Sequence, residues 1–268
     1  MVKSISNIEL FKIEVRNSIA NLSNSSPSFA RLINSLLEEG GLFLIGGYLR
    51  NVANNTADSR DIDLISTLST NDIVKIINEI GLIFSINRME GIKVVCDSIK
   101  IDVWSIQKNW SFSKDRVRWD FNTKYRSDIL VKKIADGSFF NFDSLVLDLK
   151  NYNCSVSNYN DFVERGILDI LRKRGRYKYQ NPTREANILR AFFISKKYSV
   201  ELSDNTKTYI INELNNIETL KSKNPIELIL KKSYEYKEKY KATISETELR
   251  TFLSSLKKDS GPLFELND

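Results

Sequence analysis

Hydrophobic residues change their spacing along this chain, and the change predicts two kinds of structure. Near the N-terminus and from residue 183 onward they recur every three or four positions, as in amphipathic helices. Between residues 42 and 106, short β-branched runs are separated by glycine, asparagine and aspartate, as in strands joined by turns. We therefore expect an α+β fold, in which a mixed β-sheet is flanked by helices and followed by an all-helical domain.

Local start and stop signals place the helices. Ser26-Pro27 is typical of a helix start and Gly40-Gly41 of a helix end, and Ser245 with Glu248 forms a capping box. The predicted helices cover residues 4–20, 27–39, 183–198, 204–221, 225–240 and 245–257, with one more after Ser69. We predict an N-terminal domain over residues 1–180 and a helical domain over residues 181–268.

A candidate phosphate site lies where the apolar run Leu42 to Ile45 meets two glycines. Gly46 and Gly47 allow a phosphate group to approach the backbone closely, and a helix opening at Tyr48 would direct its positive end towards the same anion. Arg50 follows on that helix, and its guanidinium matches the geometry of phosphate oxygens. The structural alternative is an ordinary turn, with Arg50 bonded to Asp61 or Asp63.

Three aspartates are candidates for metal binding. Asp61 and Asp63 lie two residues apart on a predicted strand, so both carboxylates point to one face. Asp102 lies on the second arm of a hairpin predicted over residues 92–106, on the face opposite its apolar neighbours. If the two strands are neighbours, the three carboxylates converge, and such a cluster can hold two Mg²⁺ ions about 4 Å apart.

The residue types that this chain contains limit the catalytic mechanisms available to it. The chain of 268 residues contains no histidine, which excludes a Ser-His-Asp mechanism, a His-ligated metal and His acid/base catalysis. Magnesium held by carboxylates needs no histidine. Its two cysteines, Cys96 and Cys154, lack metal-ligand spacing, and no apolar run is long enough to span a membrane. We therefore expect a cytoplasmic protein without a membrane partner.

The net charge of +6 is concentrated in one tyrosine-containing segment. Cationic and aromatic side chains together suit the phosphates and unstacked bases of single-stranded RNA. A solvated loop that keeps the protein soluble is the alternative. The RNA-binding candidates are Arg172, Lys173, Arg174, Arg176, Tyr177 and Lys178.

The glycine pair, Arg50 and the three aspartates together resemble the catalytic signature of the polymerase-β-like nucleotidyltransferase superfamily. Within it, residues 45–51 are similar to the Gly-Gly-x-(Val/Leu)-Arg-Asp element of bacterial-type CCA-adding enzymes and poly(A) polymerases, with Asn51 in place of the last Asp. The resemblance implies that Asp61, Asp63 and Asp102 bind two Mg²⁺ ions. It also implies that Gly46, Gly47 and Arg50 bind the triphosphate of an NTP such as ATP.

Two weaker likenesses concern the nucleotide. Residues 140–149 resemble the segment that contacts the ribose, which implies a role for Asp143 there, although the Arg-Arg-Asp that normally precedes it is absent. Residues 188–193 resemble part of the helix that reads the base, which implies a role for Arg190. The acidic pair and the first arginine of that helix are replaced by Thr183, Arg184 and Asn187.

The resemblance implies transfer of an NMP from an NTP to a hydroxyl group with release of pyrophosphate. The expected acceptor is an RNA 3′ end, particularly that of tRNA. Only a short helical stretch follows the Arg190 helix, so a specialised or toxin-like enzyme that modifies tRNA fits as well as a repair enzyme. Two alternatives remain: transfer to the hydroxyl of a small molecule or protein, and a catalytically silent module that binds RNA or a partner.

Overall fold

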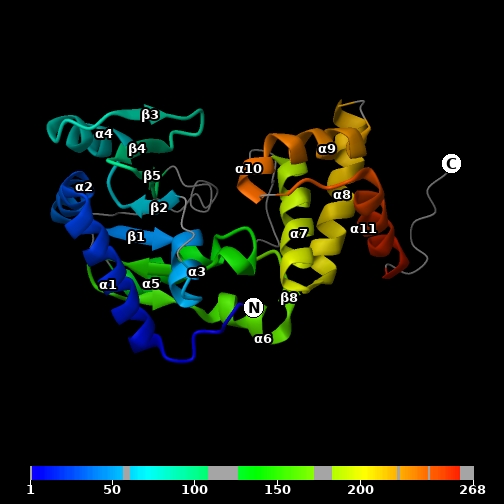
Figure 1. Cartoon of the computed structure of the whole chain (residues 1–268), viewed down its shortest axis with the longest axis horizontal. Coiled ribbons are helices and arrows are strands. Elements are labelled where there is room, and N and C mark those ends of the chain that lie inside the picture. Colours follow the sequence, from blue (N-terminus) through cyan, green and yellow to red (C-terminus); the bar gives the residue numbers. More distant parts are fainter. Residues whose placement is uncertain are drawn as a thin grey trace. The chain divides into compact units, whose positions relative to one another are not determined.

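The computed structural model describes residues 2–56, 61–107, 126–171, 183–221, 224–240 and 242–259, which form two compact units (Figure 1). The first unit contains the described residues up to Arg165, together with Leu171. The second contains Gly166–Ile170 and the described residues from Thr183 onward. The domain boundary predicted at residues 180/181 lies outside the described residues.

The first unit is built on a mixed seven-stranded sheet with the order β3-β4-β5-β2-β1-β6-β7. Neighbouring strands are antiparallel except β2 and β5, which run parallel. This sheet and the helices around it confirm the predicted α+β class. The strands are β1 (Leu42–Ile45), β2 (Asp61–Ser66), β3 (Phe84–Ile86), β4 (Ile92–Cys96), β5 (Ile99–Ser105), β6 (Val146–Asp148) and β7 (Cys154–Ser155).

Helices α1 (Ile8–Ser25), α2 (Pro27–Glu39), α3 (Gly47–Ala53) and α4 (Thr70–Glu79) belong to the same unit. The prediction that the first helix covers residues 4–20 was wrong at both ends. It begins at Ile8 because the side chain of Asn7 accepts a hydrogen bond from the Leu10 N–H at 3.0 Å, and it continues to Ser25. Ser26 then caps α2 and Pro27 occupies its first turn, as predicted.

Two helices of the first unit were not predicted: α5 (Ser127–Asp136) and α6 (Ser157–Arg165). Leu130, Val131 and Ile134 of α5 pack into a buried cluster with side chains from one face of the sheet. Those sheet residues include Phe43, Ile65 and Val146. Helix α5 therefore covers part of the face that also carries the candidate aspartates.

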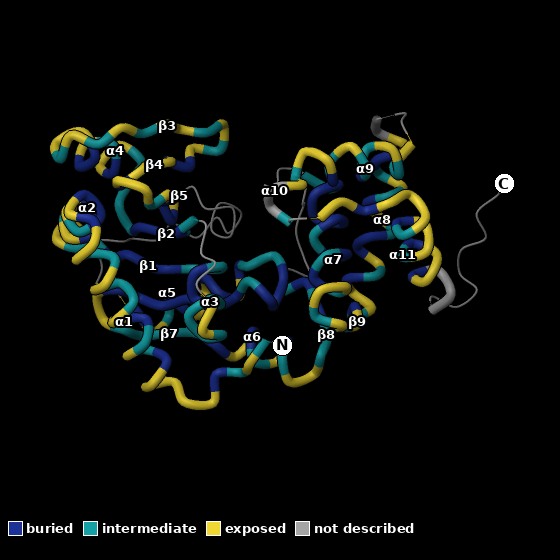
Figure 2. The backbone as a smooth tube through the Cα atoms, viewed as in Figure 1, coloured by how far each residue is buried: buried dark blue, intermediate teal, exposed yellow. Residues whose placement is uncertain are grey.

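The second unit consists mainly of helices, as predicted. Helix α7 is buried along most of its length and packs against α8, α9 and the short strands β8 and β9 (Figure 2). The predicted helix at 225–240 is divided at Tyr236 into two helices. The elements are β8 (Ile167–Leu168), α7 (Arg184–Tyr198), β9 (Glu201–Leu202), α8 (Asp204–Lys221), α9 (Pro225–Glu235), α10 (Lys237–Tyr240) and α11 (Glu246–Asp259).

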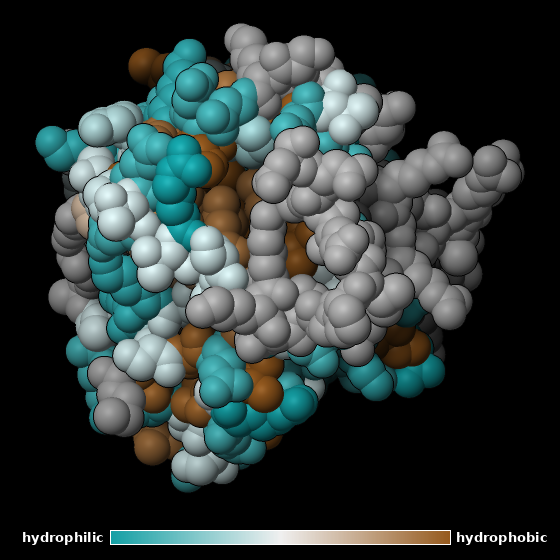
Figure 3. All heavy atoms as spheres, turned by 90° about the vertical axis from the view of Figure 1, so that its right-hand side faces the viewer, coloured by the Kyte–Doolittle hydropathy of each residue, from teal (hydrophilic) through white to brown (hydrophobic). Residues whose placement is uncertain are grey.

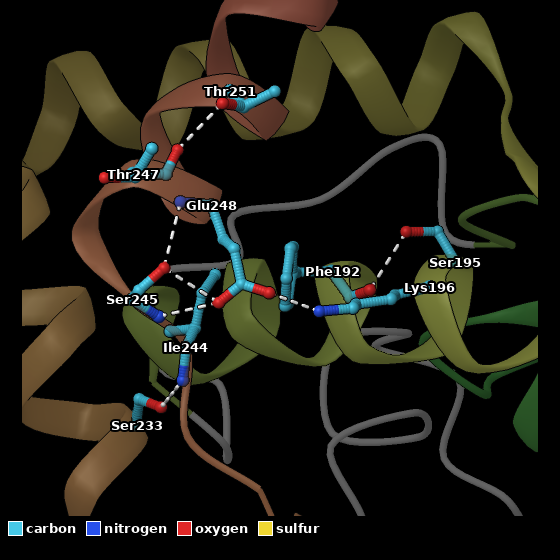
Figure 4. Close-up of polar contacts among 9 residues, drawn as sticks. All are labelled: Phe192, Ser195, Lys196, Ser233, Ile244, Ser245, Thr247, Glu248 and Thr251. Carbon is cyan, nitrogen blue, oxygen red and sulfur yellow. Dashed lines mark hydrogen bonds and ion pairs between the residues drawn. The ribbon is translucent and has the colours of Figure 1, made fainter.

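The predicted capping box at the start of α11 is present (Figure 4). The Ser245 N–H donates to Glu248 Oε2 at 2.9 Å, and the Glu248 N–H donates to Ser245 Oγ at 3.2 Å. Lys196 of α7 forms an ion pair with the same carboxylate. These contacts lower the pKa of Glu248 to about 2, mainly through the hydrogen bond from Lys196.

No helix in the described part of the chain is long and apolar enough to cross a membrane. Hydrophilic residues occupy much of the face drawn in Figure 3, beside smaller hydrophobic areas.

Candidate active site

The pairing of β2 with β5 brings the candidate aspartates together. Asp63 of β2 is the direct register partner of Asp102 on β5, and Asp61 lies one pair further along the same face. Neighbouring strands are about 4.8 Å apart, so Asp63 and Asp102 lie side by side on adjacent strands. All three residues are partly exposed, so they remain accessible to a ligand. The condition stated from sequence, that the two strands be neighbours, is met.

The hairpin that carries Asp102 is fixed at its turn. Asp97 has φ of 55°, in the left-handed region that a tight two-residue connection requires. Its carboxylate accepts hydrogen bonds from the Ser26 and Ser28 hydroxyls at the start of α2, the second at 2.7 Å. These bonds lower the pKa of Asp97 and attach the β4–β5 turn to the start of α2, where Ser26 and Ser28 are buried.

The glycine turn lies directly beside the acidic residues. Gly46 has φ of 70° and ψ of −126°, a conformation that is essentially restricted to glycine. A Cβ atom built on Gly46 would lie 3.7 Å from Asp63 Oδ2, and one built on Gly47 would lie 3.7 Å from Arg50 Nη2. Backbone, carboxylate and guanidinium groups therefore meet at the end of β1.

Arg50 is held by Asp143, a contact that the sequence did not predict. Its Nη1 donates to Asp143 Oδ1 at 2.9 Å and to the Phe142 carbonyl at 3.3 Å, and its guanidinium carbon lies 4.1 Å from the centre of the Phe142 ring. Asp143 ends the short 3₁₀ helix Asn141–Asp143. The two side chains are only 15% and 14% exposed. The residues predicted to bind the triphosphate and the ribose are thus joined in one largely buried ion pair.

Lys93 lies beside the acidic residues, although it was not among the residues predicted from the sequence. It is the register partner of Asp102 on the other side, and its Nζ lies 3.4 Å from Asp102 Oδ2. The signal was present, because a two-residue turn at Asp97-Ser98 pairs position 96 with 99 and therefore 93 with 102. Lys93, Asp102 and Asp63 form one row across three adjacent strands.

The carboxylates of this site suit a Mg²⁺ ion that binds together with a substrate. Among the described residues, no group of three acidic or cysteine side chains is gathered closely enough to hold a metal ion by itself. Mg²⁺ usually binds one or two carboxylates together with substrate phosphates and water. Asp61 and Asp63, on one face beside the glycine turn, provide such a pair.

The residues at the start of the proposed base-reading helix are engaged within the second unit. Arg184 forms an ion pair with Glu213 of α8, and Asn187 Nδ2 donates to the Tyr209 hydroxyl at 3.3 Å. Burial raises the pKa of Glu213, and Arg184 partly offsets this effect. Arg190 lies on the same helix and is partly exposed. Residues 172–178, the RNA-binding candidates, lie outside the described residues.

Comparison with known proteins identifies the fold. No protein-family profile and no curated protein sequence matches this chain, but solved structures do. A CCA-adding enzyme with CTP matches with a TM-score of 0.60 and 14% identity, over 96% of this chain and 55% of the other. The Thermotoga maritima CCA-adding enzyme complexed with tRNA matches with a TM-score of 0.55 and 11% identity, over 96% and 55%.

A tRNA nucleotidyltransferase complexed with a primer tRNA and an incoming ATP analogue also matches, with a TM-score of 0.53 and 11% identity, over 93% of this chain and 64% of the other. The chain therefore has a nucleotidyltransferase fold. More narrowly, it has the fold of about half of a CCA-adding enzyme, which confirms the fold that the resemblance implied. It spans about 55% of the length of the CCA-adding enzymes that it matches.

Proposed function

We propose that this protein is a Mg²⁺-dependent nucleotidyltransferase, which moves an NMP from an NTP to a hydroxyl acceptor and releases pyrophosphate. The observation that carries the proposal is the β2–β5 register, which pairs Asp63 with Asp102 and puts Asp61 on the same face. The glycine turn beside Asp63 supports it, because it offers a triphosphate a place next to the carboxylates.

Each residue has a distinct role in the proposal. Asp61 and Asp63 would hold Mg²⁺, which when bound activates the attacking hydroxyl and neutralises charge on the leaving pyrophosphate. Asp102 completes the acidic face and accepts the proton of the acceptor hydroxyl. Arg50 is oriented by Asp143 and Phe142, with its Nη2 beside Gly47, where it donates to phosphate oxygens.

We propose an RNA 3′ end, particularly that of tRNA, as the acceptor. Two of the structural neighbours are described in complex with tRNA, and this chain contains the basic segment at residues 172–178. The Arg184–Glu213 ion pair favours a nucleotide selectivity that differs from that of those neighbours. It engages a side chain at a position where the resemblance places a base-reading acid, so we expect weaker discrimination among NTPs than a template helix would supply.

The test is a transfer assay with each α-labelled NTP, Mg²⁺ and total cellular RNA. The parent protein is compared with Asp63→Asn and with Asp128→Asn, a matched control whose carboxylate is exposed on α5. We expect labelled RNA with the parent and the control, and none with Asp63→Asn. Label on the protein or a small molecule instead of RNA would favour the alternative acceptor. Absence of any NTP-dependent labelling would contradict catalysis.

A further inference from the structure

Two lysines lie among the proposed catalytic carboxylates. On the acidic face of the sheet, one row reads Lys93, Asp102, Asp63 across β4, β5 and β2, and the next reads Val95, Lys100, Asp61. Lys93 makes an ion pair with Asp102. Lys100 forms no ion pair with any other residue that the structure describes. The two lysines therefore carry the same charge on the same face but differ in their contact with the acids.

The two side chains of the Lys93–Asp102 pair differ in their exposure to solvent. The Lys93 side chain is 58% exposed, whereas that of Asp102 is 25% exposed and lies between two strands. An ammonium group on a flexible stem can change its partner without any backbone movement. Ile45, Asp63, Asp102 and Lys93 are successive register partners across β1, β2, β5 and β4, so a triphosphate that extends from Gly46 across Asp63 towards Asp102 would be such a partner.

We propose that Lys93 neutralises the Asp102 carboxylate until a nucleotide arrives and then binds the phosphate groups of that nucleotide. This inference rests on the proposed function. When the triphosphate binds, Lys93 exchanges the carboxylate for phosphate oxygens, and Asp102 becomes available to the divalent ion and the acceptor. Nucleotide and metal therefore bind cooperatively, and by linkage each raises the affinity of the other by the same factor.

The test measures the affinity of the protein for Mn²⁺ by electron paramagnetic resonance of the free ion. The measurement is made first without and then with a non-hydrolysable NTP. Lys93→Met removes the ammonium and keeps much of the stem, Lys93→Arg keeps the charge, and Lys100→Met removes an equal charge from the neighbouring row. Thermal unfolding of each variant checks the fold. Loss of an exposed ion pair typically changes an affinity by about two- to fivefold. We expect a change in Mn²⁺ affinity of this size.

We expect Lys93→Met to bind Mn²⁺ about two- to fivefold more tightly than the parent in the absence of nucleotide. The enhancement of Mn²⁺ binding by the NTP analogue should fall by a similar factor. Lys93→Arg should behave like the parent, and Lys100→Met should change Mn²⁺ affinity less than twofold.

Equal changes in Lys93→Met and Lys100→Met would overturn the proposal, because removal of charge alone would then explain them. Unchanged Mn²⁺ affinity in Lys93→Met would also overturn it, while leaving the proposed nucleotidyl transfer intact. A parent protein that binds neither Mn²⁺ nor the NTP analogue would instead contradict the proposed function and this inference with it.

Discussion

The substitution Gly46→Ala tests whether the glycine turn is a phosphate site. Gly46 has φ of 70° and ψ of −126°, and a residue with a side chain in this region costs about 1–3 kcal/mol. The added methyl group would lie 3.7 Å from Asp63 Oδ2, an ordinary van der Waals contact, so the loss of stability should come from the backbone alone. We expect the free energy of unfolding to fall by about 1–3 kcal/mol.

Gly46→Ala should also weaken nucleotide binding, independently of its effect on stability. The methyl group would stand where a phosphate must approach the backbone, and a relaxed turn would move the N–H groups away from Asp63. The loss of one hydrogen bond to a charged phosphate, about 1.5–3 kcal/mol, corresponds to at least about a tenfold weaker NTP affinity. Isothermal titration with a non-hydrolysable NTP measures this change, and urea unfolding measures the stability.

The chain contains a matched control for this experiment. Gly81, just after α4, has φ of 72°, and a Cβ atom built there would meet nothing within 4 Å. Gly81→Ala should cost about 1–2 kcal/mol of stability through left-handed strain and leave NTP affinity unchanged. If Gly46→Ala binds the NTP as tightly as Gly81→Ala does, the glycine turn does not contact phosphate and the reasoning fails.

Three further predictions address the acids, the second unit and the acceptor. Asp61→Ala and Asp63→Ala should each abolish transfer without lowering the unfolding temperature, since both side chains are partly exposed; activity within a few-fold of the parent would refute the site. The carboxylate of Glu248 has a pKa of about 2 in the folded chain against 4.5 ordinarily, so its contribution to stability is present above pH 4.5 and is lost as pH falls towards 2. Chemical unfolding across that window should show a smaller pH dependence in Glu248→Gln than in the parent. Replacing Arg172, Lys173, Arg174 and Arg176 by Ser should weaken RNA binding, flatten its dependence on salt and leave NTP affinity unchanged. Superimposable salt slopes for parent and variant would remove RNA as the acceptor.

The local pattern of the sequence was sufficient for much of the site. A strand alternates its faces with a period of two, so the sequence determined that Asp61 and Asp63 share a face and that Asp102 lies opposite Ile101 and Val103. The tight turn determined the β4–β5 register, and with it the pairing of Lys93 with Asp102. The helix starts at Pro27 and after Ser245 could also be predicted from local sequence, because the capping groups lie next to the helices that they begin.

Contacts between distant segments were decided by the tertiary structure. The parallel pairing of β2 with β5 depends on how the intervening chain packs, and nothing in either strand specifies its neighbour. Arg50 and Asp143 are 93 residues apart, and the burial of Phe142 brings them together. Arg184 stands where the resemblance places an acidic residue of the base-reading helix, and only the packing of α8 against α7 supplies Glu213 as its partner. Local geometry fixes which side chains share a face, whereas only packing of the whole chain determines which faces meet.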